Sequence, residues 1–352
     1  MESEKMSGFI EKSFLSPLLK DSNVTDISYN GKNIFYLNNL YGRQKSDIEI
    51  SENEVRDFIR QIANLSEKQF SFQSPKLDVS IGRFRLNAIH PSIGRRNSAH
   101  CLTFSLRITS DKPIITDQST FLNAELISLF QVLLNSGKSI IIGGITGCGK
   151  TEFQKYLIGK LPDYSRIIVI DNVLELDSLN RNENLDLNIW LADEKNEQTS
   201  IQELVRNALR TNPDWLIVAE SRGKEMIEVL NSAMTGHPII TTLHAFNVDT
   251  MPTRIARMVL MNEQKQDFNL LMQDIHYNLN YFVYLKRTIN SDGTVRRYIE
   301  EVSYIDQSGK KYPIYLFRNN QHRFYHLPIS ALENLTYQDK VFIKTFTEEK
   351  YE

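Results

Sequence analysis

The chain has few cysteines, no long apolar run and almost no net charge. Its two cysteines, Cys101 and Cys148, stand in a strand-like segment and in a glycine-rich loop, and these places indicate free thiols rather than a disulfide or a metal pair. No run approaches the roughly 18 apolar residues that a membrane-spanning helix needs, and the charged first residues lack the apolar core of a secretory signal. We therefore expect a soluble, cytoplasmic protein that reaches a membrane only by docking on a membrane complex.

The bulk composition is that of an ordinary globular protein. Of the 352 residues, 41% are apolar and 24% are charged, and the formal net charge of −2 gives no indication of a nucleic-acid or anionic-membrane surface. A local basic strip is still compatible with this balanced total. Since the length exceeds what one hydrophobic core usually serves, we expect two domains.

The strongest local signal is the sequence GGITGCGKT at residues 143–151. From Gly144 it fits G-x-x-x-x-G-K-[ST], a loop whose backbone N–H groups cradle phosphates, whose lysine reaches the β and γ oxygens and whose hydroxyl binds Mg²⁺. A strand-like run precedes it and a helix-like run follows, so a helix N-terminus would face the anion. The alternative is a glycine-rich turn without a ligand. The candidate nucleotide-binding residues are Gly144, Thr146, Gly147, Cys148, Gly149, Lys150, Thr151 and Glu152.

Residues 1–108 predict a small α+β domain. An amphipathic helix is expected over residues 4–20, two strands at 24–28 and 34–37 flank the hairpin signal Asn30-Gly31, and a capping box at 51–54 begins a helix.

Two further strands of this domain alternate clearly between apolar and polar residues. Alternation puts Arg83 and Arg85 on the polar face of the strand at 83–89, and Arg107 on the polar face of the strand at 101–108. A solvated charged face is the alternative to a row that binds an anion.

A polar, aperiodic stretch at 109–120 predicts a linker, and residues 121–352 predict the second domain. Strands alternate there with helices, which indicates a mostly parallel sheet covered on both faces. Residues 180–198 look polar, the chain is expected to turn to antiparallel strands from Tyr281, and the tail 306–352 is left without a role. Ligands of such sheets bind at the carboxyl ends of the strands, where Gly144, Asp171, Glu220 and His244 fall.

Polar side chains at these strand ends are the candidate catalytic groups. Hydrolysis of a phosphoanhydride needs a group that orients water, and Glu220 is the best candidate, through a direct or a water-mediated link to Mg²⁺. The alternative is a surface glutamate at the end of a strand. Asp171 and Glu175 form a second acidic cluster. His237 and His244 lack a third ligand at metal spacing, so a polar contact is favoured over a metal site.

Four segments in order resemble the secretion ATPase family of type II and type IV secretion, conjugation, and type IV and Tad pili. They are GGITGCGKT, an acidic box IDNVLEL at 170–176, LRTNPDWLIVAESRG at 209–223 and a histidine box TGHPIITTLHA at 235–245. Upstream, GRFRLNAIHP and LTFSLRI resemble strands of the family's N-terminal domain. The similarity covers roughly residues 20–305 and is closest to the type IV secretion and Tad-like branch.

The resemblance implies a hexameric ring of two-domain subunits that hold ATP and Mg²⁺ between a RecA-like P-loop ATPase core and a PAS-like α+β N-terminal domain. It implies that Lys150 and Thr151 contact phosphate and Mg²⁺, that Glu220 activates water and binds Mg²⁺, and that Glu175 serves in the acidic box. It further implies nucleotide contacts for His237, His244, Arg210 and Arg222, and it implies that Arg83, Arg85 and Arg107 are clamps on the terminal phosphate.

The chain also departs from the family pattern. Asp171-Asn172 stands where the family usually has Glu-Asp, Glu152 replaces a hydroxyl residue and adds negative charge beside the metal site, and Ala219 stands where glycine is common. These departures are compatible with slow turnover. We expect Glu175→Ala to reduce turnover more than Asp171→Ala, with little loss of folding stability for either.

The sequence thus predicts a Mg²⁺-dependent ATPase motor for macromolecular export or pilus assembly, held at the cytoplasmic membrane by integral membrane platform or channel proteins. The alternatives are a DNA-stimulated translocase, which the near-neutral charge argues against, and a nucleotide-gated scaffold with weak ATPase activity. The cargo, the direction of movement and the membrane partners stay open.

Overall fold

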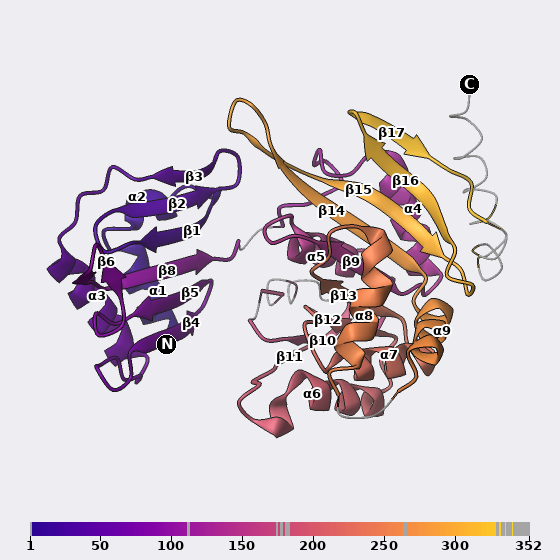
Figure 1. Cartoon of the computed structure of the whole chain (residues 1–352), viewed down its shortest axis with the longest axis horizontal. Helices are drawn as coiled ribbons and strands as arrows, with labels where there is room; N and C mark the ends of the chain where they lie inside the picture. The colour runs from indigo at the N-terminus through magenta and orange to yellow at the C-terminus, as the bar shows by residue number, and fades with distance from the viewer. Residues whose placement is uncertain are drawn as a thin grey trace. The chain divides into compact units, whose positions relative to one another are not determined.

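The structure is a computed structural model that describes residues 2–110, 113–173, 175–176, 179, 184–262, 266–328, 331, 335 and 340. The chain forms two compact units, Met1–Lys112 with Thr288–Arg296, and Pro113–Arg287 with Arg297–Glu352 (Figure 1). No helix in the described part of the chain is long and apolar enough to cross a membrane.

The first unit is an antiparallel sheet packed against helices. Its strand order is β3 (Gly42–Lys45), β2 (Ile34–Asn38), β1 (Val24–Tyr29), β8 (Thr103–Ile108), β5 (Phe84–Ile89) and β4 (Lys76–Ile81), and β6 (Arg95–Arg96) pairs with β7 (Ala99–His100). The helices are α1 (Glu2–Glu11), α2 (Ser16–Leu19) and α3 (Glu52–Leu65). Strands β3 and β4 were not expected, although β4 alternates apolar and polar residues as a half-buried strand does.

Local signals explain how two of these helices begin. The capping box of α3 is confirmed: Ser51 accepts a hydrogen bond from the Glu54 amide, and the Glu54 carboxylate accepts one from the Ser51 amide. The single helix expected at 4–20 is wrong, because α1 ends at Glu11 and α2 begins anew at Ser16. Pro17 disfavours helical backbone at the residue before it and suits the first turn of a helix, so it separates the two.

The second unit has a sheet in the order β11 (Asp186–Leu191), β10 (Arg166–Asp171), β12 (Trp215–Val218), β13 (Ile239–Leu243), β9 (Ile140–Gly144), β14 (Tyr281–Ile289), β15 (Val295–Ile305), β16 (Lys311–Arg318) and β17 (Gln321–Phe324). Its helices are α4 (Ala124–Asn135), α5 (Lys150–Ile158), α6 (Ile201–Ala208), α7 (Met226–Met234), α8 (Met251–Val259) and α9 (Phe268–Asn278), with 3₁₀ turns η2 (Glu197–Thr199), η3 (Leu209–Thr211) and η4 (Val248–Thr250).

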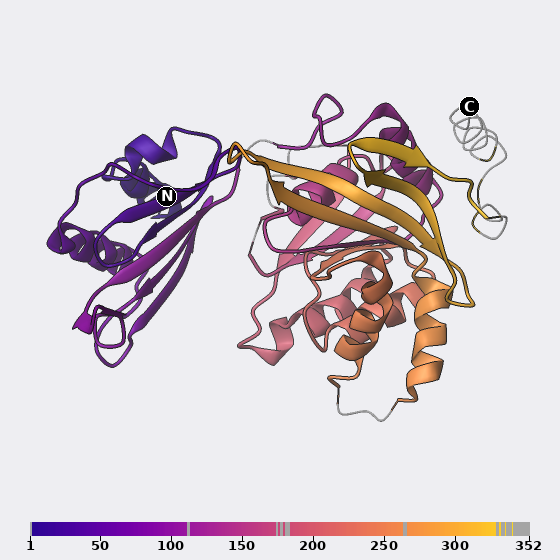
Figure 2. The same ribbon diagram turned by 45° about the horizontal axis from the view of Figure 1, so that its top comes forward.

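The predicted parallel sheet covered on both faces is confirmed. Strands β11, β10, β12, β13, β9 and β14 pair in parallel. Along β9, Ile140 and Ile142 pack on the side of α4 and α5, whereas Ile141 packs on the side of α6 to α9. Figure 2 shows α6 to α9, in rose to orange, together on one side of the sheet. This burial on both faces explains why the strands are continuous apolar runs.

Two expectations for this sheet are wrong. Strand β14 is parallel to β9, with Tyr281 opposite Ile140, because the helices α8 and α9 supply the crossover that parallel pairing requires. Antiparallel pairing is found among β15, β16 and β17. Strand β11 lies within the stretch that looked polar; it is an edge strand whose residues are only partly buried, so its apolar signal is weak.

Candidate functional site

The glycine-rich loop joins the carboxyl end of β9 to the first turn of α5. Gly147 and Gly149 have φ angles of +75° and +99°, which other residues rarely adopt. A Cβ on Gly144 would lie 2.5 Å from Cys148 Sγ and 2.6 Å from the Leu285 carbonyl oxygen, so a side chain there would force the loop out of place. The loop is therefore a cradle of backbone that ends at the N-terminus of a nine-residue helix, where amide groups point outward.

Lys150 is held at the mouth of this loop. Its side chain is largely buried, and its Nζ lies 3.1 Å from the Gly144 carbonyl oxygen and 3.3 Å from that of Ile145. Its Nζ is also 3.4 Å from Nδ1 of His244. His244 therefore lies between the Lys150 ammonium, which faces its Nδ1, and the Glu220 carboxylate, which faces its Nε2.

Glu220 follows β12, and its backbone is fixed on both sides. The Ala219 amide donates to the Ile170 carbonyl oxygen at 2.9 Å, and the Ser221 amide donates to that of Thr242 at 2.8 Å. Its Oε2 accepts a hydrogen bond from Arg222 at 2.5 Å. Burial acts to raise the pKa of Glu220, but Arg222, His244 and Lys150 outweigh it, and the pKa lies below its usual value. The carboxylate is ionised at neutral pH.

The second oxygen of Glu220 keeps its capacity to accept. Nε2 of His244 lies 2.9 Å from Oε1, yet Oε1 is buried and receives no well-directed hydrogen bond from the described residues. Burial and the charge of Lys150 lower the pKa of His244, so its imidazole is neutral at neutral pH. A buried carboxylate oxygen that receives no well-directed hydrogen bond can still accept one from a water molecule or a metal-bound water.

Arg222 connects Glu220 to the acidic box. The hydrogen bond to Glu220 raises the pKa of Arg222, and the nearby charges of Glu220, Glu175 and Glu225 raise it further. The structure therefore brings Glu175, Glu220 and Arg222 into one electrostatic group beside Lys150 and His244.

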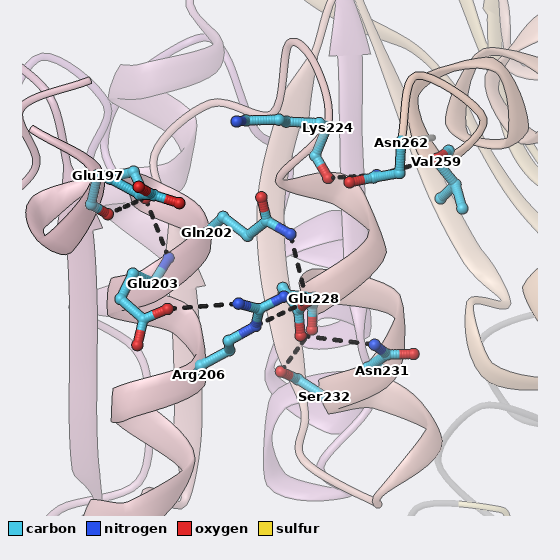
Figure 3. Close-up of polar contacts among 11 residues, drawn as sticks. Glu197, Gln202, Glu203, Arg206, Lys224, Glu228, Asn231, Ser232, Val259 and Asn262 are labelled. Atoms are coloured by element: carbon cyan, nitrogen blue, oxygen red, sulfur yellow. Dashed lines mark hydrogen bonds and ion pairs between the residues drawn. The ribbon is translucent and has the colours of Figure 1, made fainter. Parts of the chain in front are cut away.

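A polar network holds the helices that frame this strand end. Arg206 of α6 donates from Nε at 2.9 Å and from Nη2 at 2.7 Å to one oxygen of Glu228 in α7 (Figure 3). Gln202 reaches the same oxygen, and Asn262 donates to the Lys224 carbonyl oxygen at 2.9 Å. These bonds tie α6 to α7 and hold the backbone at Lys224 in the segment after Glu220.

Asp171 has a structural position. Its Oδ1 accepts the Val173 amide at 3.0 Å, its Oδ2 accepts the Leu176 amide at 3.2 Å, and only 2% of the residue is exposed. Burial raises its pKa although these bonds act against the rise. Both of its oxygens thus hold the acidic box in shape, which argues against the expectation that Asp171 contributes little to folding stability.

Two predicted nucleotide contacts, His237 and Arg210, precede β13 and β12, whereas the phosphate-loop residues gather where the strands end. His237 precedes β13 and His244 follows it, so roughly 20 Å of extended backbone separates them. His237 contacts Thr235 at 3.1 Å instead. Arg210 lies in η3, ahead of β12, whereas Glu220 follows that strand. In a single chain, the structure does not bring His237 and Arg210 to the phosphate loop.

Glu152 adds no uncompensated charge at the loop, contrary to expectation. Its Oε1 lies 2.8 Å from Nζ of Lys155, whose side chain is only 4% exposed, and its Oε2 accepts the Ile114 amide at 3.4 Å. The carboxylate is neutralised within α5 and tied to the preceding chain.

In the first unit, the expected row of three arginines contains two. Arg85 and Arg107 are direct neighbours in the pairing of β5 and β8 and so share a face, and Arg85 lies 3.6 Å from Asp78. Arg83 lies in the turn before β5, where its guanidinium forms a 3.1 Å ion pair with Glu11 of α1.

Sequence reasoning missed Arg287 and Arg297, which lie against the loop from β14 and β15. Arg297 Nε donates to the Gly147 carbonyl oxygen at 2.8 Å. Nothing in the local pattern distinguishes these two from other strand arginines, because the contact joins segments 150 residues apart.

Known proteins are similar to this chain in sequence and in fold. A family model described as type II/IV secretion system protein matches residues 75–284, more than half of the chain. An uncharacterised protein of Bacillus anthracis is 32% identical over 288 residues, which are 80% of this chain but only 62% of that relative. The type IV secretion system protein VirB11 of Brucella suis is 31% identical over 170 residues, 47% of this chain and 46% of VirB11.

The structure of the Legionella pneumophila ATPase DotB aligns with a TM-score of 0.63 and 21% identity over 84% of this chain and 81% of DotB. That likeness confirms the predicted fold class, a RecA-like ATPase core with a smaller α+β N-terminal domain. Together with the family match over more than half of its length, it leads to one conclusion: the chain belongs to the secretion ATPase family of type II/IV secretion system proteins.

Proposed function

We propose that this chain is a Mg²⁺-dependent ATP-hydrolysing motor that acts as a homo-hexamer at a membrane secretion complex. The observation that carries the proposal is the ionised Glu220 beside Lys150 and His244, with one buried oxygen that can still accept a hydrogen bond. Such a carboxylate at a phosphate loop can orient the water that attacks a terminal phosphate. Family membership supports the assignment to secretion or pilus assembly.

Each residue of the site has a role in this proposal. The loop amides and Lys150 hold the β- and γ-phosphates, and Thr151 with Glu220, through water, fits a Mg²⁺ ion. Bound Mg²⁺ would neutralise phosphate charge. Glu220 accepts the proton of the attacking water, neutral His244 fixes the positions of Lys150 and Glu220, and Arg222 keeps Glu220 ionised.

Steady-state ATPase assays with Mg²⁺ or with EDTA test the chemistry. Lys150→Ala should abolish hydrolysis and weaken ATP binding, whereas Glu220→Gln should bind ATP normally and turn over at most about one hundredth as fast, since it keeps the shape and removes the charge. Turnover of Glu220→Gln within a factor of a few of wild type would refute the role of Glu220.

The ring and its setting require a separate measurement. We expect mass determination in ATP to find a hexamer, and specific activity to rise with protein concentration. Arg107 stays a candidate contact for the terminal phosphate, so Arg107→Ala should lower the rate without changing ADP affinity. We place the motor in the cytoplasm, bound peripherally to the membrane through platform or channel proteins; pull-down of such a protein in ATP would support this.

A nucleotide-gated scaffold is the second candidate, and one observation favours it. Asp171 is occupied by backbone amides and Asn172 is neutral, so Glu175 is the carboxylate that the acidic box has left for catalysis. Tight ATP binding with negligible turnover, and no effect of Glu175→Ala, would support the scaffold. Addition of single-stranded DNA to the same assay tests the translocase, which predicts a faster rate.

A further inference from the structure

The phosphate loop has two flanks in the sheet, and each carries a different set of side chains. The order β12, β13, β9, β14, β15 places Glu220 and His244, which follow β12 and β13, on one flank. Strand β14 lies on the other flank, with Leu285 opposite Gly144, and Arg287 comes two residues later on the same strand. Arg297, near the start of β15, approaches from that flank too.

Both arginines line the loop closely. Besides its bond to the Gly147 carbonyl oxygen, Arg297 has its Cδ 3.9 Å from where a Cβ on Gly149 would be. The Cδ of Arg287 lies 4.0 Å from the corresponding point on Gly147. These two glycines have the positive φ angles that shape the cradle, so the side chains of both arginines border the loop that would hold an anion.

No carboxylate neutralises the positive charge of Arg287 among the residues that the structure describes. Its Nε is buried without a hydrogen-bond partner, and no ion pair or side-chain hydrogen bond joins Arg287 to the residues that the structure describes. Burial and the charge of Arg287 lower the pKa of Arg297. By contrast, Arg206 and Arg222 each contact a carboxylate at 2.7 Å or less. A buried donor beside a second cation is costly unless an anion joins them.

Building on the proposed function, we propose that Arg287 and Arg297 bind the phosphate groups that ATP and ADP share, from the flank of the loop opposite Glu220. A terminal phosphate that meets Glu220 and His244 points toward β12 and β13. The rest of the phosphate chain must then leave the loop toward β14 and β15, where the two guanidinium groups lie. Arginine suits this position because its planar fork can bind two phosphate oxygens at once.

This assignment predicts that the two arginines contribute equally to the binding free energies of ATP and ADP. An interaction made to the shared phosphates stabilises the bound product as well as the substrate, so its loss raises KM without lowering kcat. If product release limits turnover, kcat of the variant rises. A contact to the terminal phosphate would instead weaken ATP alone.

Calorimetric titration with ADP and with a non-hydrolysable ATP analogue tests the inference on wild type, Arg287→Met, Arg287→Lys and Arg318→Met. Arg287→Met should weaken the affinity for both nucleotides by about ten- to a hundredfold, the range of a charge-assisted hydrogen bond. The affinities of Arg287→Lys should lie between those of Arg287→Met and wild type. Arg318→Met is the matched control, since Arg318 is an exposed arginine at the end of β16 in the same sheet, and it should bind as wild type does.

The outcomes separate this inference from the proposed function. A wild-type chain that binds neither nucleotide refutes the proposed function. Wild-type affinity in Arg287→Met, or a loss confined to the ATP analogue, overturns the inference while the ATPase proposal stands. Tryptophan fluorescence during urea unfolding identifies a variant that fails to fold, and in that case Arg287→Lys decides: ADP affinity equal to wild type overturns the inference.

Discussion

Asp171 should contribute to stability rather than to chemistry, and Asp171→Ala measures this. The change leaves the amides of Val173 and Leu176 without acceptors in a site that is 2% exposed. Each orphaned amide costs about 1–3 kcal/mol, and relief of the buried charge returns part of that, so we expect a net loss of about 3 kcal/mol. For a domain of this size, that lowers the melting temperature by roughly 6–12 °C.

Urea unfolding followed by tryptophan fluorescence is the assay, because the two tryptophans, Trp190 and Trp215, lie in β11 and β12 of the second unit. Asp193→Ala is the matched control, since Asp193 follows the neighbouring strand and accepts one exposed amide, that of Lys195, at 3.0 Å. The unfolding midpoint of Asp171→Asn should lie between those of wild type and Asp171→Ala, because the amide oxygen of asparagine can accept only one of the two hydrogen bonds. Equal unfolding midpoints for Asp171→Ala and Asp193→Ala would refute the reasoning.

Three further predictions concern the elements around the site. Arg206→Leu should cost about 1–2 kcal/mol in the same urea experiment, because Glu228 keeps its burial and loses its cation; equal stability of wild type and variant would contradict this. Asp117→Asn should speed cleavage by the nonspecific protease proteinase K within residues 113–120, because the Asp117 carboxylate accepts hydrogen bonds from Tyr156 at 2.7 Å and Lys160 at 2.5 Å, and cleavage at the wild-type rate would count against it. The pKa of Glu220 lies below its ordinary value of 4.5, so its carboxylate loses its charge only as the pH falls through that lowered pKa. We therefore expect the pH profile of kcat to show no fall caused by Glu220 between about pH 5 and 8. A fall in this range for wild type that Glu220→Gln lacks would contradict the prediction.

The sequence by itself determined the features that depend on neighbouring residues. The glycine spacing of the loop, the capping box at Ser51 and the apolar strand before Glu220 each specify a local backbone conformation. Alternation of strands and helices then restricts the topology to a parallel sheet, and in such a sheet the carboxyl ends of the strands share one edge. Lys150, Glu220 and His244 could therefore be predicted to meet.

The tertiary structure decided which partner each charged side chain takes. Asp171 and Glu175 look alike in the sequence, yet the backbone amides of the folded box occupy one of them, and Lys155 neutralises the carboxylate of Glu152. Arg287 and Arg297 reach the loop because β14 pairs with β9 from far along the chain. Hydrogen bonds and charge interactions act over a few ångströms of space. Once helices and sheets have packed, the number of residues between two side chains no longer indicates how far apart they lie.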